Sequence, residues 1–239
     1  MTVRHPYPGK DLEAMSFAIN YHRWILDEMR PYLGRNIAEV GAGTGSFSEM
    51  LLAESLDSLT LIEPSEMFDA LKNNISSLGT TAKINLHNST FAEAVLDRAP
   101  PDGVDSIIYV NVLEHIEDDE AELGLMHKGL EIGGRCFIFV PALMSLYGNF
   151  DRAVGHVRRY SKTELEKKCA TAGFKVIKSK YFDIAGVLPW YIKYKLLRSD
   201  SLSAGAVEFY DKMVVPVASR LERILRVPVG KNILLIAEK

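Results

Sequence analysis

Residues 39–47 read EVGAGTGSF, and this stretch decides the fold. A short apolar run precedes it, and glycines stand at alternate positions, Gly41, Gly43 and Gly45. Glycine lacks a side chain and allows the backbone to turn sharply and to approach a ligand closely. A helix that begins directly after such a turn presents free N–H groups at its N-terminus. The stretch therefore predicts a strand, a nucleotide-binding turn and a helix.

The rest of the chain continues this alternation and predicts a doubly wound α/β fold. Strands that are apolar throughout and that alternate with helices require a parallel sheet covered on both faces. An N-terminal helix before the first strand and a helical insertion before the last strand complete the prediction. The expected strands are 36–41, 59–64, 82–88, 104–112, 133–141, 174–182 and 232–239, and the expected helices are 12–33, 46–56, 65–75, 118–131, 161–173 and 205–226.

Length and composition indicate one globular domain over residues 1–239. The chain is 47% hydrophobic and 25% charged, which suits a full core. We expect an N-terminal helical cap in 1–35, a cofactor-binding core in 36–140, and an acceptor loop, insertion and C-terminal strands in 141–239. No apolar run reaches the roughly 18 residues of a membrane span, and no signal peptide is recognisable. We therefore expect a cytoplasmic protein.

Charge is distributed unevenly. Residues 1–150 hold 10 Lys and Arg against 22 Asp and Glu, whereas residues 151–239 hold 18 against 9. This asymmetry predicts that the C-terminal part meets an anionic group, and the alternative is that the two parts simply complement each other. A sequence pI of about 6.1 argues against a nucleic-acid binder.

Two features narrow the nucleotide. Ser46 stands where the dinucleotide fingerprint has its third glycine, and the Gly-Lys-Ser/Thr of a P-loop is absent. Glu63 ends the next strand, where a carboxylate accepts hydrogen bonds from ribose hydroxyls. These features favour an adenosine-containing ligand other than a dinucleotide. An oxidoreductase on a similar sheet and a non-catalytic binding module remain the alternatives.

The segments AEVGAGTGSF, LIEPSEMF and DSIIYVNVLEHIEDDE together resemble motifs of the class I S-adenosylmethionine-dependent methyltransferases. The resemblance implies a Rossmann-like sheet of seven strands whose last strand is antiparallel, and S-adenosylmethionine as the cofactor. It implies that Glu39 and the glycine turn hold the methionine end and that Glu63 holds the ribose. Members of this family usually contact the adenine amino group through an acidic residue at the positions of Ser89 and Thr90. This chain has no acid there, so its adenine contact departs from the family pattern. The implied cofactor residues are Glu39, Gly41, Ala42, Gly43, Gly45, Glu63, Pro64, Ser65, Met67, Ser89, Thr90, Asn111 and Val112.

Methyl transfer to an O–H or N–H group needs alignment and a base. His115 follows the fourth strand, and His156 lies in an Arg-rich loop, so both are candidate catalytic residues, with a packing role as the alternative. Cations in this loop suit a carboxylate or phosphate, and the alternative is that they pair with the acidic run 117–120. Tyr160 is the third catalytic candidate. The candidate substrate-binding residues are Tyr21, Arg152, Arg158, Arg159 and Tyr160.

Segment 187–198 mixes aromatic and basic side chains. This composition is typical of a helix on an anionic membrane surface or against a lipid-linked substrate, and a lid helix is the alternative. Cys136 and Cys169 are expected to be packing residues, and no metal site is expected. Together these patterns predict a methyltransferase acting on an O or N atom of a small, anionic or carrier-linked acceptor.

Overall fold

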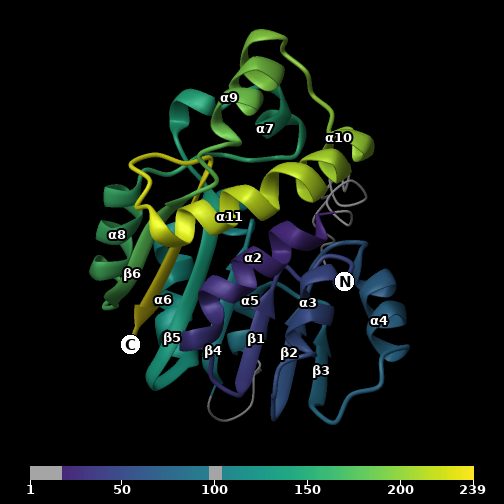
Figure 1. Ribbon diagram of the computed structural model, residues 1–239. Coiled ribbons are helices and arrows are strands. Elements are labelled where there is room, and N and C mark those ends of the chain that lie inside the picture. The colour runs from purple at the N-terminus through teal and green to yellow at the C-terminus, as the bar shows by residue number, and fades with distance from the viewer. Residues whose placement is uncertain (1–17, 97–103) are drawn as a thin grey trace.

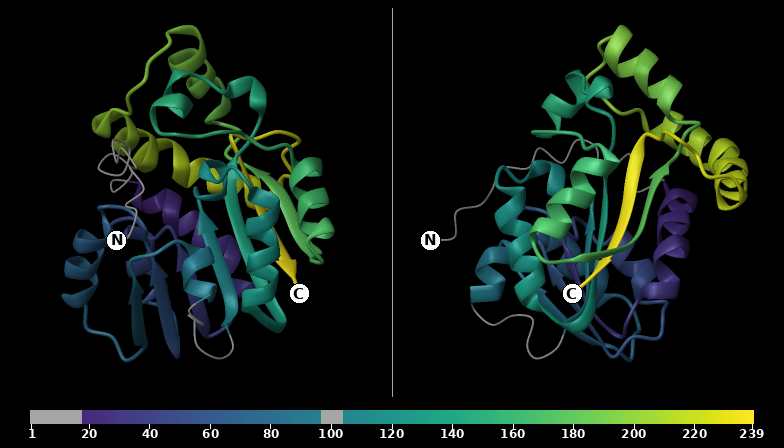
Figure 2. Two further views of the ribbon diagram at one scale, coloured as in Figure 1. Left: turned by 180° about the vertical axis from the view of Figure 1, so that it is seen from behind. Right: turned by 90° about the vertical axis from the view of Figure 1, so that its left-hand side faces the viewer.

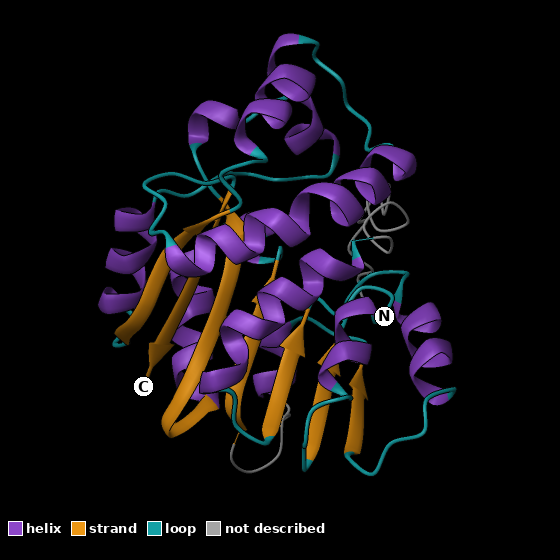
Figure 3. Cartoon of the chain, in the orientation of Figure 1, coloured by secondary structure: helices purple, strands orange, loops and turns teal. Residues whose placement is uncertain are grey.

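A seven-stranded sheet organises the chain, in the order β3-β2-β1-β4-β5-β7-β6. The computed structural model describes residues 18–96 and 104–239, and Figures 1 and 3 show the sheet with helices packed around it. β7 lies antiparallel between β5 and β6, while the remaining paired strands run parallel. The prediction of seven strands with an antiparallel last strand is confirmed. The strands are β1 (Asn36–Val40), β2 (Ser58–Ile62), β3 (Lys83–His87), β4 (Val104–Val110), β5 (Leu130–Pro141), β6 (Lys175–Phe182) and β7 (Asn232–Glu238).

Helices cover both faces of the sheet, as the right-hand view of Figure 2 shows. α2 (Ile19–Met29), α3 (Ser46–Leu51) and α11 (Val215–Ile224) pack on one face, and α5 (Phe91–Leu96), α6 (Asp119–Gly129) and α8 (Lys162–Thr171) pack on the other. Neighbouring strand residues point to opposite faces, so Ile108 joins the first core and Ile107 the second. Both buried cysteines lie in the second core, which confirms their packing role.

The N-terminal helix is shorter than predicted. α2 ends at Met29 because Pro31 cannot donate the hydrogen bond that continues a helix, and a 3-10 turn, η1 (Arg30–Tyr32), follows. Residues 12–17 of the predicted helix lie outside the described residues. Trp24 packs against Phe182 with ring centroids 3.9 Å apart, and Tyr21 contacts the same ring edge-on.

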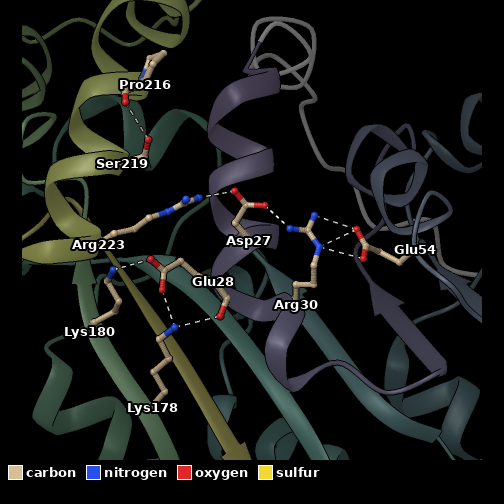
Figure 4. Close-up of polar contacts among 9 residues, drawn as sticks. All are labelled: Asp27, Glu28, Arg30, Glu54, Lys178, Lys180, Pro216, Ser219 and Arg223. Atoms are coloured by element: carbon tan, nitrogen blue, oxygen red, sulfur yellow. Dashed lines mark hydrogen bonds and ion pairs between the residues drawn. The ribbon is translucent and has the colours of Figure 1, made fainter.

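Ion pairs connect α2 to two distant segments, as Figure 4 shows. The carboxylate of Glu28 pairs with two lysines of β6. Its Oε2 lies 2.6 Å from Nζ of Lys178, and its Oε1 lies 3.0 Å from Nζ of Lys180. Burial alone would raise the pKa of Glu28, but the hydrogen bonds from the two lysines outweigh burial and lower the pKa. Asp27 pairs with Arg223 of α11 at 2.6 Å. The helix is thereby fixed between the C-terminal strands and α11.

The remaining helices gather above the carboxyl ends of the parallel strands (Figure 1). Together they form a roof over this edge of the sheet, except that α4 flanks its β3 end. They are α4 (Phe68–Ser76), η2 (Leu113–His115), η3 (Met144–Leu146), α7 (Asn149–Ala153), α9 (Val187–Trp190), η4 (Tyr191–Leu196), α10 (Ala204–Phe209) and η5 (Tyr210–Val214). η4 and η5 are π-helical turns, so α9 continues through η4, and α10 continues through η5 into α11.

We predict that Ile25→Ala destabilises the protein by about 2–5 kcal/mol, because Ile25 is fully buried where α2 packs on the sheet. Ile19→Ala is the matched control: it lies on the same helix, is 51% exposed, and should change the free energy of unfolding by less than about 0.5 kcal/mol. Urea unfolding of both variants measures the difference. Equal effects would contradict the packing of α2 described here.

Candidate functional site

The glycine turn has the backbone that its sequence predicts. Gly41, Gly43 and Gly45 have φ values of 71°, 57° and 94°, in the left-handed region that favours glycine. A Cβ added to Gly41 would lie 2.4 Å from a Cγ of Val112, which follows β4. The turn therefore packs directly on the end of the neighbouring strand, and α3 begins immediately after it.

Glu63 joins two loops at the carboxyl edge of the sheet. Its Oε2 accepts a hydrogen bond from the backbone N–H of Gly43 at 2.7 Å, and its Oε1 accepts one from Ser65 at 2.8 Å. The residue is 5% exposed. A carboxylate has about four lone-pair sites, so each oxygen keeps capacity for a further donor such as a hydroxyl group.

Glu39 is buried one strand away, beside the same turn. Ser48 of α3 donates a hydrogen bond to its Oε2 at 2.6 Å. Burial raises the pKa of Glu39 to about 8, and the neighbouring Glu63 acts in the same direction, while the hydrogen bond from Ser48 opposes both. A nearby cation would favour the ionised form of this carboxyl group and lower its pKa.

A cavity of about 220 Å³ lies between the sheet edge and the roof. Asn111 lines it at the end of β4, with a φ of 55° that is uncommon outside glycine. The floor is further lined by residues following β4 and β5, and the roof by α9, η4, α10 and η5. The lining comprises Ala18, Tyr21, Asn111, His115, Pro141, Phe150, His156, Arg159, Gly186, Pro189, Trp190, Lys193, Tyr194, Leu202, Ala206, Val207, Tyr210, Asp211, Val215, Lys231 and Asn232.

Two histidines meet at this cavity. The ring centroids of His115 and His156 are 4.8 Å apart, with the planes 76° to each other. Burial lowers the pKa of His115 to about 4, and His156 lowers it further, while a hydrogen bond to the backbone of Gly155 opposes the shift. His115 is therefore neutral near pH 7. The Nδ1 of His156 lies 2.9 Å from Oδ1 of Asp151.

Asp151 is fully buried and organises the wall on this side. The same Oδ1 accepts a hydrogen bond from Nε of Arg159 at 2.8 Å, and Oδ2 accepts one from the backbone of Gly148. Burial would raise the pKa of Asp151, but the bonds from His156 and Arg159 lower it. The guanidinium of Arg159 also lies over the Trp190 ring at 4.8 Å. This network fixes the orientation of both His156 and Arg159.

One group at the cavity has the donor atoms of a metal site. Atoms of Glu114, His115 and His156 lie within 4.8 Å of one another, and Oε1 of Glu114 is 3.7 Å from Nε2 of His156. Two imidazoles and a carboxylate suit divalent transition metals. Sequence reasoning expected no metal, because it considered only cysteine spacing.

Comparison with known proteins identifies the family. A family model described as a methyltransferase domain matches residues 20–179. The chain belongs to this methyltransferase family. It is an S-adenosylmethionine-dependent methyltransferase, and the predicted resemblance is confirmed. No curated protein matches the sequence significantly.

Solved structures share the fold of this methyltransferase at low sequence identity. An S-adenosylmethionine-dependent methyltransferase from Archaeoglobus fulgidus superposes with a TM-score of 0.64 at 21% identity, covering 95% of this chain and 98% of that chain. A possible histamine N-methyltransferase from Thermotoga maritima gives 0.57 at 16% identity, covering 95% and 93%. A mycolic acid cyclopropane synthase in complex with S-adenosylhomocysteine gives 0.59 at 14% identity, covering 90% and 82%.

The predicted acceptor residues of the methyltransferase fall into two groups. Four of them line the cavity, namely Tyr21, His115, His156 and Arg159, and so does Asn111, a predicted cofactor residue. Arg152 is exposed and lies over the Tyr147 ring, and Arg158 pairs with Asp119 at 2.7 Å. Arg158 thus fits the alternative prediction, in which the arginines of this loop pair with the acidic run 117–120. Neither arginine belongs to the cavity lining.

Tyr160 also lies away from the cavity lining. Its hydroxyl donates to Asp119 at 2.8 Å and the side chain is fully buried. Burial and the neighbouring Asp119 raise the pKa of Tyr160 far above its ordinary value. The residue therefore links the loop after α7 to the start of α6.

Ser89 and Thr90 follow β3, where the methyltransferase family usually has an acid. Both the backbone N–H and the hydroxyl of Thr90 bond Glu93, which places Thr90 at the start of α5. The Ser89 hydroxyl is buried and has no hydrogen-bond partner among the described residues. Of the two, Ser89 is the side chain with hydrogen-bonding capacity to spare.

Sequence reasoning missed several cavity residues of the methyltransferase. Lys231 precedes β7 and pairs with the buried Asp183 at 3.0 Å, and its Nζ lies over the rings of Tyr21, Trp190 and Tyr210. Lys193 of η4 also lines the cavity, and no ion pair of Lys193 occurs within residues 18–96 and 104–239. Only the basic composition of 187–198 pointed toward Lys193. Nothing local in the sequence singled out Lys231.

We predict that Glu39 makes the stability of the ligand-free methyltransferase depend on pH. Its pKa in the folded protein is about 8, against an ordinary value of 4.5 for a glutamate side chain, so the folded state binds the proton more tightly. The stabilising contribution is full below about pH 4.5 and is lost as the pH rises through 8.

Glu39→Gln removes this contribution, because it keeps an acceptor for Ser48 but does not titrate. Between pH 6 and 8 the free energy of unfolding of the wild type should fall relative to the variant by up to about 1.4 kcal/mol per pH unit. Urea unfolding of both proteins across this range measures the difference, and parallel profiles would contradict the prediction.

Proposed function

We propose that the protein transfers the methyl group of S-adenosylmethionine to an O or N atom of a small acceptor that is anionic or carrier-linked. The observation that carries this proposal is the position of the cavity, because Asn111 belongs both to the end of β4, beside the glycine turn, and to the cavity wall. A cofactor at the turn and an acceptor in the cavity would then be neighbours. Holding the two reactants together supplies most of what in-line transfer requires.

The residues at the turn fit the proposed cofactor. Glu63 would accept hydrogen bonds from the ribose hydroxyls, and Glu39 with the backbone of Gly41–Gly45 would face the methionine end. Pro64, Ser65 and Met67 would flank the adenine, whose amino group would meet Ser89 or the backbone near Thr90. The remaining proposed contacts at this site are Ala42, Asn111 and Val112. When bound, the cofactor supplies an activated methyl group on a sulfonium.

The histidine pair is the proposed catalytic group at the acceptor side. His115 is neutral at pH 7, and a pKa near 4 makes it a weak base. Asp151 orients His156. Tyr160, Arg152 and Arg158 receive a structural role in this proposal, because each is engaged elsewhere. We also propose that the protein works in the cytoplasm as one domain, in line with its free thiols and with β7 lying between β5 and β6.

An anionic acceptor is supported by the charges in the cavity. Arg159 and Lys231 each face it, but Asp151 and Asp183 already neutralise them. Lys193 is therefore the cation most available to a carboxylate or phosphate. A carrier-linked or lipid-linked acceptor is supported by the apolar and aromatic remainder of the wall. By its name, one structural neighbour acts on mycolic acid, which is a lipid.

We predict that a panel of sugar phosphates, carboxylates and lipid-linked glycans contains an acceptor that releases S-adenosylhomocysteine above background. Lys193→Gln should raise the KM for an anionic acceptor at least about tenfold, as expected for the loss of a charge-assisted hydrogen bond. Lys195→Gln is the matched control on the same helix, since Lys195 lies outside the cavity lining and donates to the backbone of Tyr147.

Initial-rate assays of S-adenosylhomocysteine release measure these effects. No release with any acceptor of the panel would refute the proposed acceptor class. Release with equal KM for the Lys193 and Lys195 variants would show that Lys193 does not bind the acceptor.

A further inference from the structure

Segment 184–225, which includes α9, η4, α10 and η5 of the roof and continues as α11 along the sheet, exposes an unusual amount of apolar surface. Twelve of the seventeen exposed large apolar side chains among the described residues lie between residues 184 and 225. Contiguous exposed apolar surface of this kind marks a site of interaction. No helix within residues 18–96 and 104–239 is both long enough and apolar enough to cross a membrane.

These side chains form regular stripes along two helical segments. On α10, η5 and α11 an exposed apolar residue occurs at every fourth position, and on α9 and η4 the same spacing recurs. A π-helical turn holds more residues than an α-helical one, so η5 keeps the four-residue stripe aligned. The stripes consist of Phe209, Met213, Val217, Leu221 and Leu225, and of Leu188, Ile192 and Leu196, each between 42% and 65% exposed.

The opposite faces of α9, η4, α10 and η5 line the cavity, whereas the opposite face of α11 packs on the sheet and contributes only Val215 to the lining. Trp190 and Tyr194 point inward from α9 and η4, and Val207 and Tyr210 from α10 and η5. Figures 1 and 2 show α9 and α10 above the carboxyl edge of the sheet, and α11 running on from α10 across one face of the sheet. The roof therefore has an inner face that forms the cavity and an outer face without a partner in the described chain.

Cations accompany the outer face. Six exposed cations lie in this region, namely Lys195, Arg198, Lys212, Arg220, Arg223 and Arg226. Lys212 pairs with Glu208 and Arg223 with Asp27, whereas the other four form no ion pair within residues 18–96 and 104–239. Two of its four acids, Asp211 and Glu222, are buried and bond backbone N–H groups inside the protein. The surface thus combines an apolar stripe with an excess of positive charge, the combination that favours binding to anionic lipid.

We propose that the outer face of α9–η4 and α10–α11 docks on a membrane that contains anionic lipids. The apolar stripes would lie in the interface, and the cations would face the lipid headgroups. A second copy of the chain is the other candidate occupant, but a two-fold interface would oppose cations to cations. Docking brings the cavity next to the bilayer, so the acceptor would be an amphipathic molecule with a membrane-bound tail. Only this last step rests on the proposed function.

Vesicle flotation of the full chain tests the docking. Wild-type protein should float with vesicles containing anionic phosphatidylglycerol, and much less with pure phosphatidylcholine or at high salt. Met213→Glu combined with Leu221→Glu should reduce binding at least tenfold, because both side chains lie on the stripe. Ile132→Glu is the control, since Ile132 is 93% exposed on β5 and should bind as the wild type does.

A second variant tests the electrostatic part. Changing Arg198, Arg220 and Arg226 to Gln should weaken binding to anionic vesicles roughly a hundredfold, given about 1 kcal/mol for each cation near the surface. S-adenosylhomocysteine binding reports that each variant is folded, because none of the changed residues lines the cavity.

Three results would overturn the proposal. Wild-type protein could remain unbound with anionic vesicles, or Ile132→Glu could lose as much binding as the stripe variant. Sedimentation velocity could instead show a dimer that the stripe variant dissociates, with no vesicle binding, which would assign the surface to a second copy. Vesicle binding needs no methyl transfer, so a failure here is distinguishable from a failure of the proposed function.

Discussion

The hydrogen bonds of Glu63 hold together the edge of the sheet on which the site is built. One carboxylate oxygen binds the backbone of the glycine turn after β1, and the other binds the backbone of the loop after β2. The loop positions therefore depend on one buried side chain at a strand end. Because parallel strands end at the same edge, the same carboxylate faces the place where a nucleotide would lie. The Glu63 carboxylate therefore both holds the two loops in place and is the proposed ribose-binding group.

The C-terminal part of the chain turns this edge into an enclosed site. Segments 187–196 and 204–214 run over the strand ends. The ion pair between Asp27 and Arg223 joins α11, which continues the second segment, to α2, and Glu28 joins β6 to the same helix. These pairs also account for part of the uneven charge distribution, since C-terminal cations meet N-terminal carboxylates. Most of the exposed C-terminal cations lie between residues 195 and 226. The two interpretations of the charge asymmetry therefore apply to different residues.

The core could be predicted from the sequence because its signals are local. The glycine turn, the acid that ends the next strand and the alternation of apolar strands with helices each occupy a few consecutive residues. The antiparallel last strand came only from the family resemblance. Several residues of the cavity wall were predicted, but their side-chain pairing could not be, because its contacts join separate segments. Asp151 bonds both His156 and Arg159, and Lys231 pairs with the distant Asp183. Tyr160 and Arg158 look equivalent to Arg159 in the sequence, yet their side chains bond Asp119 instead of facing the cavity.

The central claim is that Glu63 binds the ribose of the cofactor. Calorimetric titration of S-adenosylhomocysteine into wild type, Glu63→Gln and Glu66→Gln tests it most directly, since Glu66 is exposed three residues away. The account predicts saturable binding to the wild type and to Glu66→Gln, and binding to Glu63→Gln that is weaker by about 1.5–3 kcal/mol, the value for hydrogen bonds to a charged group. Equal affinity of a folded Glu63→Gln variant would contradict the account.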